Sequence, residues 1–195
     1  YYRVMWLARR PRRKTSSVVH RGDAGERRTV DRDSLCPCGQ EDNCMRLINA
    51  LTVDVEDYFH VSAFSNHIDR NHWDRYPCRV EANTRALLGL FGKAGVKATF
   101  FVLGWVAERY PALVREIASA GHEVACHGYS HELVYRQTPA VFRDETRRAK
   151  EVLENIIQQP VKGYRAASYS ITPKSTWALD VIAEIDPNVA PSVTD

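Results

Sequence analysis

From Met45 onward, hydrophobic positions alternate between the spacing of strands and the spacing of helices. Runs of apolar and β-branched residues predict strands over residues 47–55, 97–103, 123–126 and 161–164. Apolar residues at helical spacing predict helices over 81–93, 106–120, 138–158 and 172–184. The second helix should break or kink at Pro111. The last two open with Thr-Pro, which places an N-cap residue before a proline at the first helical position.

A strand, a helix and then another strand indicate parallel strands with helices packed outside the sheet. The pattern therefore predicts an α/β fold, and it fits a closed or nearly closed barrel as well as an open sheet. In either architecture, functional side chains gather at the carboxyl ends of the strands. With 195 residues, 44% of them hydrophobic, the chain can form one globular domain with its own core.

Residues 1–44 differ from the rest because they show no hydrophobic period and are rich in Arg, Ser, Asp and Gly. Residues 1–46 contain 11 Lys and Arg against 6 Asp and Glu, a net charge of +5, whereas 47–195 contain 16 against 18, a net of −2. We expect 1–44 to be a disordered basic leader, or mis-annotated upstream sequence ahead of a natural start at Met45. The domain should then occupy 45–195.

Composition disfavours several classes of protein. No run of about 18 apolar residues is present, so no transmembrane helix is predicted. The N-terminal arginines are not followed by an apolar stretch of the signal-peptide type, so we expect a cytoplasmic protein. The basic run RRPRRK lacks interleaved aromatic residues, which argues against a nucleic-acid partner. Five cysteines, an odd number, argue against a complete disulfide framework.

Ionisable side chains occur where three of the predicted strands end: an acidic group after the first, two histidines after the third and an arginine after the fourth. In chain order they are Asp54, Glu56, Asp57, His127, His131 and Arg165. Because the carboxyl ends of parallel strands meet at one edge of a sheet, we expect them to lie together. Two imidazoles and a carboxylate are the ligands of many catalytic divalent-metal sites, and a second carboxylate nearby can serve as a general base.

The acidic run DVED can supply both a ligand and a base. Residues two apart on a strand share a face, so Asp54 and Glu56 should point together. Asp57 would point the same way only if the strand ends and turns there. Aromatic residues are numerous near these groups, which suggests a carbohydrate groove; core packing is the other interpretation. They are Tyr58, Phe59, Trp73, Trp105, Tyr129, Tyr135 and Tyr169.

Three motifs, TVDVED, HGYSH and RAASYS, occur in this order at intervals that resemble the polysaccharide deacetylase family, carbohydrate esterase family 4. The stretches LTVDVEDYFHVSAF, RVEANTRALLGLFGKAGVKATFFVLGWVAERYP and GHEVACHGYSHELVYRQTP resemble the bacterial exosortase-associated subfamily found at exopolysaccharide loci. The resemblance covers about residues 45–184. It implies a distorted (β/α) barrel and a metal-dependent hydrolase that removes N-acetyl groups from an N-acetylated polysaccharide or oligosaccharide.

The resemblance also implies roles for individual residues. Asp54 matches the catalytic base, and Arg165 matches the arginine that orients and charge-pairs it. His127 and His131 match the metal-binding histidines. The cation is expected to be zinc, with cobalt or nickel as alternatives.

The third ligand follows less directly from the resemblance. Many members have two adjacent aspartates, and here Val55 occupies the second position. Relatives with an Asp-x-Asp arrangement suggest Glu56, with Asp57 as the fallback. Tyr169 and Tyr129 are the expected substrate contacts.

The sequence departs from the family pattern in three places. Ala167 replaces a common proline, and Cys126 precedes His127 where a small residue such as serine is usual. The late Leu-x-His motif, which supplies the general acid, should lie beyond residue 195, and IDPNVAPSVTD after Glu184 no longer resembles the family. We therefore expect a truncated domain with a barrel that is incomplete at its C-terminus. The upstream histidines at 60, 67 and 72 are not expected to replace the missing one.

Two alternative functions remain open. The chain could be a truncated, non-catalytic carbohydrate-binding remnant of a deacetylase domain. It could also be a metal-dependent hydrolase of another non-peptide amide.

Overall fold

The computed structural model describes residues 4–9 and 48–192. The strands are β1 (Val4–Arg9), β2 (Ile48–Val55), β3 (Thr99–Val102), β4 (Glu123–Cys126), β5 (Gly163–Arg165) and β6 (Ala190–Ser192). The α-helices are α1 (Val80–Ala94), α2 (Gly104–Arg109), α3 (Pro111–Ser119), α4 (Pro139–Ile157) and α5 (Trp177–Ile185). Short 3-10 helices are η2 (Tyr58–His60), η3 (Ser62–Phe64), η4 (Arg70–Arg75), η5 (Val134–Arg136) and η6 (Ala167–Tyr169).

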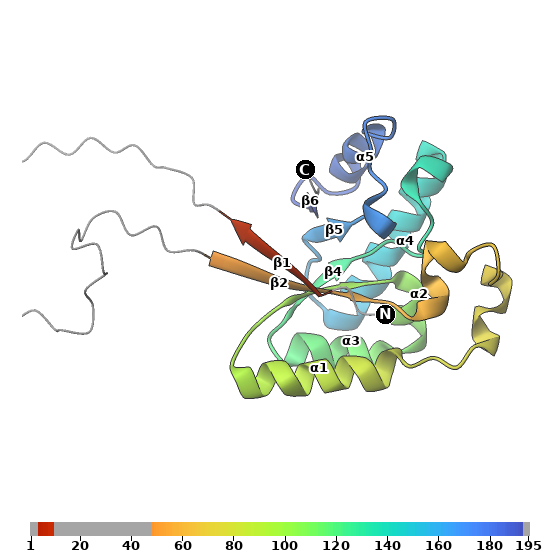
Figure 1. Ribbon diagram of the computed structural model, residues 1–195. Helices are drawn as coiled ribbons and strands as arrows, with labels where there is room; N and C mark the ends of the chain where they lie inside the picture. Colours follow the sequence, from red (N-terminus) through yellow and green to blue (C-terminus); the bar gives the residue numbers. More distant parts are fainter. Residues whose placement is uncertain (1–3, 10–47, 193–195) are drawn as a thin grey trace, which may run out of the picture. The chain divides into compact units, whose positions relative to one another are not determined.

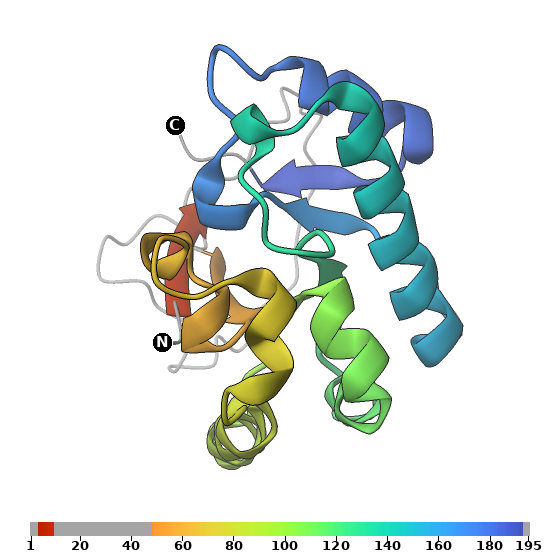
Figure 2. The same ribbon diagram turned by 90° about the vertical axis from the view of Figure 1, so that its right-hand side faces the viewer.

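The order of the strands decides between the two architectures that the sequence left open. Strands β2 to β6 are neighbours in chain order, and each adjacent pair is parallel. Parallel crossovers are right-handed, so an order that never reverses brings the connecting helices to the same side of the sheet. An open doubly wound sheet would reverse its order. The sheet is therefore part of a (β/α) barrel, with helices along its outer side (Figures 1 and 2).

Alternation along the strands separates an apolar outer face from a more polar inner face. Phe100 is fully buried on the outer face, where its ring packs 6.1 Å from that of Phe91 in α1. On the inner face, Asp54, Phe101 and Ala125 are register partners in one row across β2, β3 and β4. The Arg165 guanidinium stacks 3.9 Å from the Phe101 ring centre and bonds to Asp54, so these two charged side chains lie on the inner face.

Local chemistry explains most helix ends. Helix α1 ends at Gly95, whose φ of 64° favours glycine, and α2 and α3 are separated just before Pro111. The side chain of Thr138 caps α4 by accepting a hydrogen bond from the Val141 N–H, as the Thr-Pro signal predicted. The Thr-Pro pair at Thr172 does not open α5, so the predicted start of that helix is wrong.

Helix α5 begins at Trp177, five residues later than predicted, because a closed turn precedes it. The Thr172 N–H donates to Ser175 Oγ at 2.8 Å, and the Ser175 N–H donates to the Thr172 carbonyl at 2.8 Å. Pro173 therefore lies inside this turn and does not open a helix.

Several strands also differ from the predictions. Strands β3 and β5 each begin two residues later than expected, and β6 was missed because its three residues carry no alternating pattern. Strand β1 lies within the segment expected to be disordered, and the rest of residues 1–44 falls outside the described part of the chain. Of the helices within the described ranges, none combines the length and hydropathy needed to cross a bilayer.

An aromatic cage, formed by Phe59, Trp73 and Trp105, surrounds the imidazole of His60. The ring centre of His60 lies 4.3, 4.5 and 4.8 Å from these three rings, respectively. His60 is 2% exposed, and its Nδ1 accepts a hydrogen bond from the Asp57 N–H at 2.8 Å. Burial lowers the pKa of His60 to about 3, although the charge of Glu56 partly opposes this shift. The cage therefore holds a neutral imidazole.

The HGYSH loop after β4 is fixed against the start of α2. The Gly104 N–H donates to the Gly128 carbonyl at 2.9 Å, and the Trp105 N–H donates to the Tyr129 carbonyl at 3.2 Å. A Cβ atom on Gly104 would lie 2.5 Å from Tyr129 Cδ2 and 3.1 Å from the Ala149 Cα, which leaves no room for a side chain.

We predict that Gly104→Ala destabilises the protein by about 1–3 kcal/mol, because the added methyl group pushes the HGYSH loop away from α2 and α4. Gly89→Ala is the matched control, since a Cβ there meets nothing within 4 Å and the position is in the interior of α1. It should stabilise by about 0.5–1 kcal/mol. Urea denaturation measures both changes; equal effects of the two substitutions would contradict the packing argument.

The caged histidine predicts a pH dependence of stability in the metal-free protein. Its pKa is lower in the folded state than in the unfolded state, so its contribution is present above pH 6.5 and is lost as the pH falls toward 3. The pKa of Glu56 is also lowered, so this carboxylate acts in the same direction once the pH falls below the usual pKa of a glutamate, about 4.5. Between about pH 6.5 and pH 4.5, wild type should lose more stability than His60→Asn, measured by urea denaturation. Equal losses in the two proteins would be the contrary result.

Candidate metal centre

Five ionisable side chains from three strand ends lie together at one edge of the sheet. Asp54 is near the end of β2 and Glu56 directly follows it. His127 directly follows β4, His131 lies four residues further on, and Arg165 is the last residue of β5. All five are at most 8% exposed, so this charged cluster is almost completely shielded from solvent.

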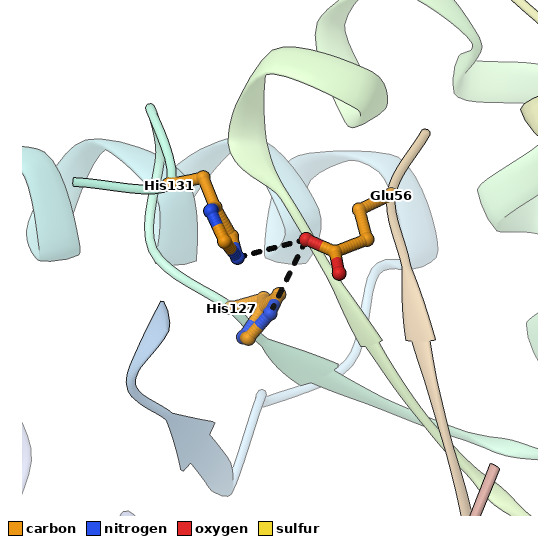
Figure 3. Close-up of side chains that lie close together, drawn as sticks. All are labelled: Glu56, His127 and His131. Atoms are coloured by element: carbon orange, nitrogen blue, oxygen red, sulfur yellow. Dashed lines mark ion pairs between the residues drawn. The ribbon is translucent and has the colours of Figure 1, made fainter. Parts of the chain in front are cut away.

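Glu56, His127 and His131 form a group with the geometry of a cation site. One ligand atom from each lies within 4.8 Å of the others. Oε2 of Glu56 is 2.8 Å from Nε2 of His131 and 4.0 Å from Nε2 of His127. Figure 3 shows both imidazoles directed toward this carboxylate from the HGYSH loop.

A backbone contact fixes the orientation of His127. Its Nδ1 lies 2.8 Å from the Arg165 carbonyl oxygen, which accepts the Nδ1 hydrogen in the neutral imidazole. Its Nε2 therefore carries the lone pair, is buried, and has no hydrogen-bond partner among residues 48–192. A buried lone pair without a partner is costly in an apolar interior. A cation bound between the three side chains would satisfy it, so these residues fit a divalent metal.

The electrostatics of the group also suit a cation. Burial lowers the pKa of His127, and the charge of Asp54 only partly opposes this effect, so the imidazole is neutral at pH 7. Burial by itself would raise the pKa of Glu56, but the hydrogen bond with His131 and the electrostatic effect of the facing imidazoles lower it overall. Metal ligation requires neutral histidine and ionised carboxylate, which are the forms favoured for His127 and Glu56.

Asp54 and Arg165 form a buried ion pair beside this group. Nη1 of Arg165 donates to Oδ1 of Asp54 at 2.6 Å, and Nη2 donates to Thr52 Oγ1 at 3.1 Å. The second carboxylate oxygen, Oδ2, faces His127 Nε2 at 4.0 Å. The ion pair thus turns one oxygen of Asp54 toward the three candidate ligands.

Asp57 and Tyr129, two site residues predicted from the sequence, make contacts away from the candidate ligands. The carboxylate of Asp57, the fallback ligand, accepts hydrogen bonds from the backbone N–H groups of Tyr58 and Arg79 and caps the turn after β2. The hydroxyl of Tyr129 donates to Glu108 at 2.7 Å, and the ring lies under the Arg148 guanidinium at 3.9 Å. Both side chains are occupied by structural contacts outside the group of candidate ligands.

Tyr169, the other expected substrate contact, lies beside the ion pair. Its ring centre is 5.6 Å from the Arg165 guanidinium carbon, and it is partly exposed. Its φ of 54°, with 49° at Ser168 and 53° at His131, is unusual for residues other than glycine. Such backbone strain clusters at functional sites, and no sequence signal revealed it at these positions.

His60 lies beside the candidate ligands, a position that was not predicted from the sequence. Its ring contacts the Asp57 N–H, next to Glu56, and the charges of Glu56, His131 and His127 all act on its pKa. The spacing of four residues from Glu56 could have suggested this neighbourhood, had the turn after β2 been recognised.

Comparisons with known proteins agree with this fold and site. A crystal structure described as a polysaccharide deacetylase from Mycobacterium smegmatis has 30% sequence identity and a TM-score of 0.58, over 69% of this chain and 47% of that chain. A family 4 carbohydrate esterase from Streptomyces lividans, in complex with acetate, has 26% identity and a TM-score of 0.53, over 62% and 58%.

Among curated proteins, a chitooligosaccharide deacetylase from Bradyrhizobium sp. (strain ANU 289) is 33% identical over 100 residues, which are 51% of this chain and 43% of the relative. The matched part is thus less than half the length of that relative. The family model described as polysaccharide deacetylase matches residues 72–182, more than half of the chain. With a parallel, barrel-type sheet and this match, the chain belongs to the polysaccharide deacetylase family.

Proposed function

We propose that this chain is part of a metal-dependent hydrolase that removes N-acetyl groups from an N-acetylated polysaccharide or oligosaccharide. The observation that carries the proposal is the Glu56, His127 and His131 group, with the carboxylate of Asp54 turned toward it by Arg165. This arrangement offers three ligands and a separate base, as amide hydrolysis assisted by a metal requires.

The chain's own residues have distinct tasks in the proposed reaction. A divalent cation, when bound, lowers the pKa of coordinated water and polarises the acetyl carbonyl. Asp54 accepts the proton of the attacking water at Oδ2, the oxygen that faces His127. Arg165 holds Oδ1 and thereby fixes the orientation of the base, while the Arg165 carbonyl keeps His127 in the tautomer whose Nε2 can act as a ligand.

The donor set supports a choice of metal. Two imidazole nitrogens and one carboxylate suit zinc, and imidazole ligands also accommodate cobalt and nickel. We therefore propose zinc as the cation, with cobalt and nickel as functional substitutes. Asp57 and His60 lie next to this group but do not belong to it, because both side chains are engaged in the turn after β2.

The names of two relatives and the position of one aromatic side chain support the proposed substrate class. Two of the matched curated relatives are named as a chitooligosaccharide deacetylase and a peptidoglycan-N-acetylglucosamine deacetylase. Tyr169, partly exposed beside Arg165, offers an aromatic face to a sugar ring. The resemblance of residues 51–64, 79–111 and 121–139 to the exosortase-associated subfamily supports a role in bacterial exopolysaccharide synthesis.

Metal uptake and its loss on substitution test the proposed ligands. His127→Ala should weaken zinc affinity at least about 100-fold, because it removes one of three protein ligands. Asp54→Asn should change the affinity less than about tenfold, because Asp54 is not a ligand. Competition titration against a zinc-binding dye measures both, with circular dichroism to verify that each variant is folded. Equal zinc affinities of His127→Ala and wild type would refute the assignment.

Acetate release from an N-acetylglucosamine oligomer, with zinc or cobalt added, tests the reaction. Asp54→Asn should lower the rate about 10²- to 10⁴-fold, the usual contribution of a general base. A wild-type chain that binds zinc but releases no acetate would favour the carbohydrate-binding remnant. Release from simple amides, and not from the sugar, would favour a hydrolase of another amide.

A further inference from the structure

The backbone that carries Glu56 turns sharply at the next residue, and a reciprocal pair of hydrogen bonds holds this turn. The Asp57 carboxylate accepts from the backbone N–H of His60, and Nδ1 of His60 accepts from the Asp57 N–H at 2.8 Å, which makes a capping box at the start of η2. The Asp57 carboxylate also accepts from the Tyr58 N–H at 2.8 Å. The Asp57 N–H belongs to the same peptide as the Glu56 carbonyl, so His60 fixes the peptide plane that follows Glu56.

The imidazole that accepts this hydrogen bond has little freedom to move. The aromatic cage surrounds it, and the side chain is 2% exposed. Since Nδ1 is the acceptor, Nε2 carries the hydrogen in the neutral ring. His60 therefore has no lone pair to give to a cation, which excludes it as a fourth ligand although it lies beside the site.

Glu56 depends on this turn more than the two histidines do. It lies one residue beyond the end of β2, where the ladder of strand hydrogen bonds no longer fixes the backbone. His127 is held by the Arg165 carbonyl, and the HGYSH loop is held by Gly104. In the described part of the chain, the ion-pair contacts of the Glu56 side chain are those with His131 and His127, the other two candidate ligands.

We propose that His60 is a positioning residue of the metal centre: by accepting the Asp57 N–H, it fixes the peptide after Glu56 and directs the Glu56 carboxylate toward His131 and His127. This inference rests on the proposed metal-dependent function and adds a residue that neither binds the cation nor contacts the substrate. Outer residues that orient ligands typically change metal affinity 10- to 100-fold.

His60→Asn and His60→Leu provide a matched pair of variants. Both side chains have nearly the same shape and both remove the aromatic ring, so both should lower the stability of the metal-free protein. Only asparagine offers an oxygen near the position of Nδ1 that can accept the Asp57 N–H. We expect His60→Asn to bind zinc within about threefold of wild type, and His60→Leu to bind roughly 10- to 100-fold more weakly.

Trp73→Phe is the control for a purely structural role. It disturbs the aromatic cage without touching the capping box, so it should lower stability and leave zinc affinity unchanged. Hydrogen exchange of the Asp57 amide supplies a readout without metal: the amide should be protected in wild type and in His60→Asn, and should exchange faster in His60→Leu.

Two results would overturn the inference while leaving the metal centre intact: equal zinc affinities of the asparagine and leucine variants, or a Trp73→Phe variant that weakens zinc binding as much as His60→Leu. If wild type binds no zinc although its Asp57 amide is protected, the turn is formed and the proposed metal centre itself is wrong. The inference then falls with it.

Discussion

The site depends on the burial of one carboxylate against two imidazoles, a group whose charge and lone pairs suit a bound cation. Glu56 is an ionised carboxylate in an interior where isolated charge is costly, and the imidazoles that face it are buried with it. The contact with His131 at 2.8 Å offsets part of this cost, but Nε2 of His127 stays without a hydrogen-bond partner among the described residues. Buried polar groups in proteins rarely lack a partner. A bound cation would neutralise the Glu56 carboxylate and bind the lone pair of His127 Nε2 at the same time.

The fold provides this balance through its strand order. Five parallel strands follow one another without reversal, so their carboxyl ends form one rim, and residues distant in the sequence meet there. Asp54 and Arg165 are 111 residues apart, yet their side chains are 2.6 Å apart. His127, directly after β4, is held by the carbonyl of Arg165, the last residue of β5, which fixes its tautomer. The position, tautomer and orientation of His127 thus follow from a few backbone contacts.

Periodicity predicted the elements with long or well-capped patterns, and left the site only partly described. Helix α4 was predicted almost to the residue because Thr138 and Pro139 mark its start. The same Thr-Pro pair at Thr172 lies in a closed turn, so it misplaced the start of α5, and β6 carries no signal of either kind. The grouping of Asp54 and Glu56 could be inferred from their spacing on one strand.

Other contacts of the site depend on tertiary structure. The cap by Asp57 and the outward contacts of Tyr129 involve Arg79, Glu108 and Arg148, which are distant in sequence. His60 was passed over for a similar reason: its task depends on a capping box and an aromatic cage, and Trp105 of that cage is 45 residues away.

A crystal of the full chain soaked in zinc, with diffraction recorded on both sides of the zinc absorption edge, tests the central claim most directly. We predict one strong anomalous peak at ligand distance from Nε2 of His127, Nε2 of His131 and the Glu56 carboxylate, about 2.0–2.2 Å from each. A peak bound by other residues, or no peak between these three side chains, would contradict the account.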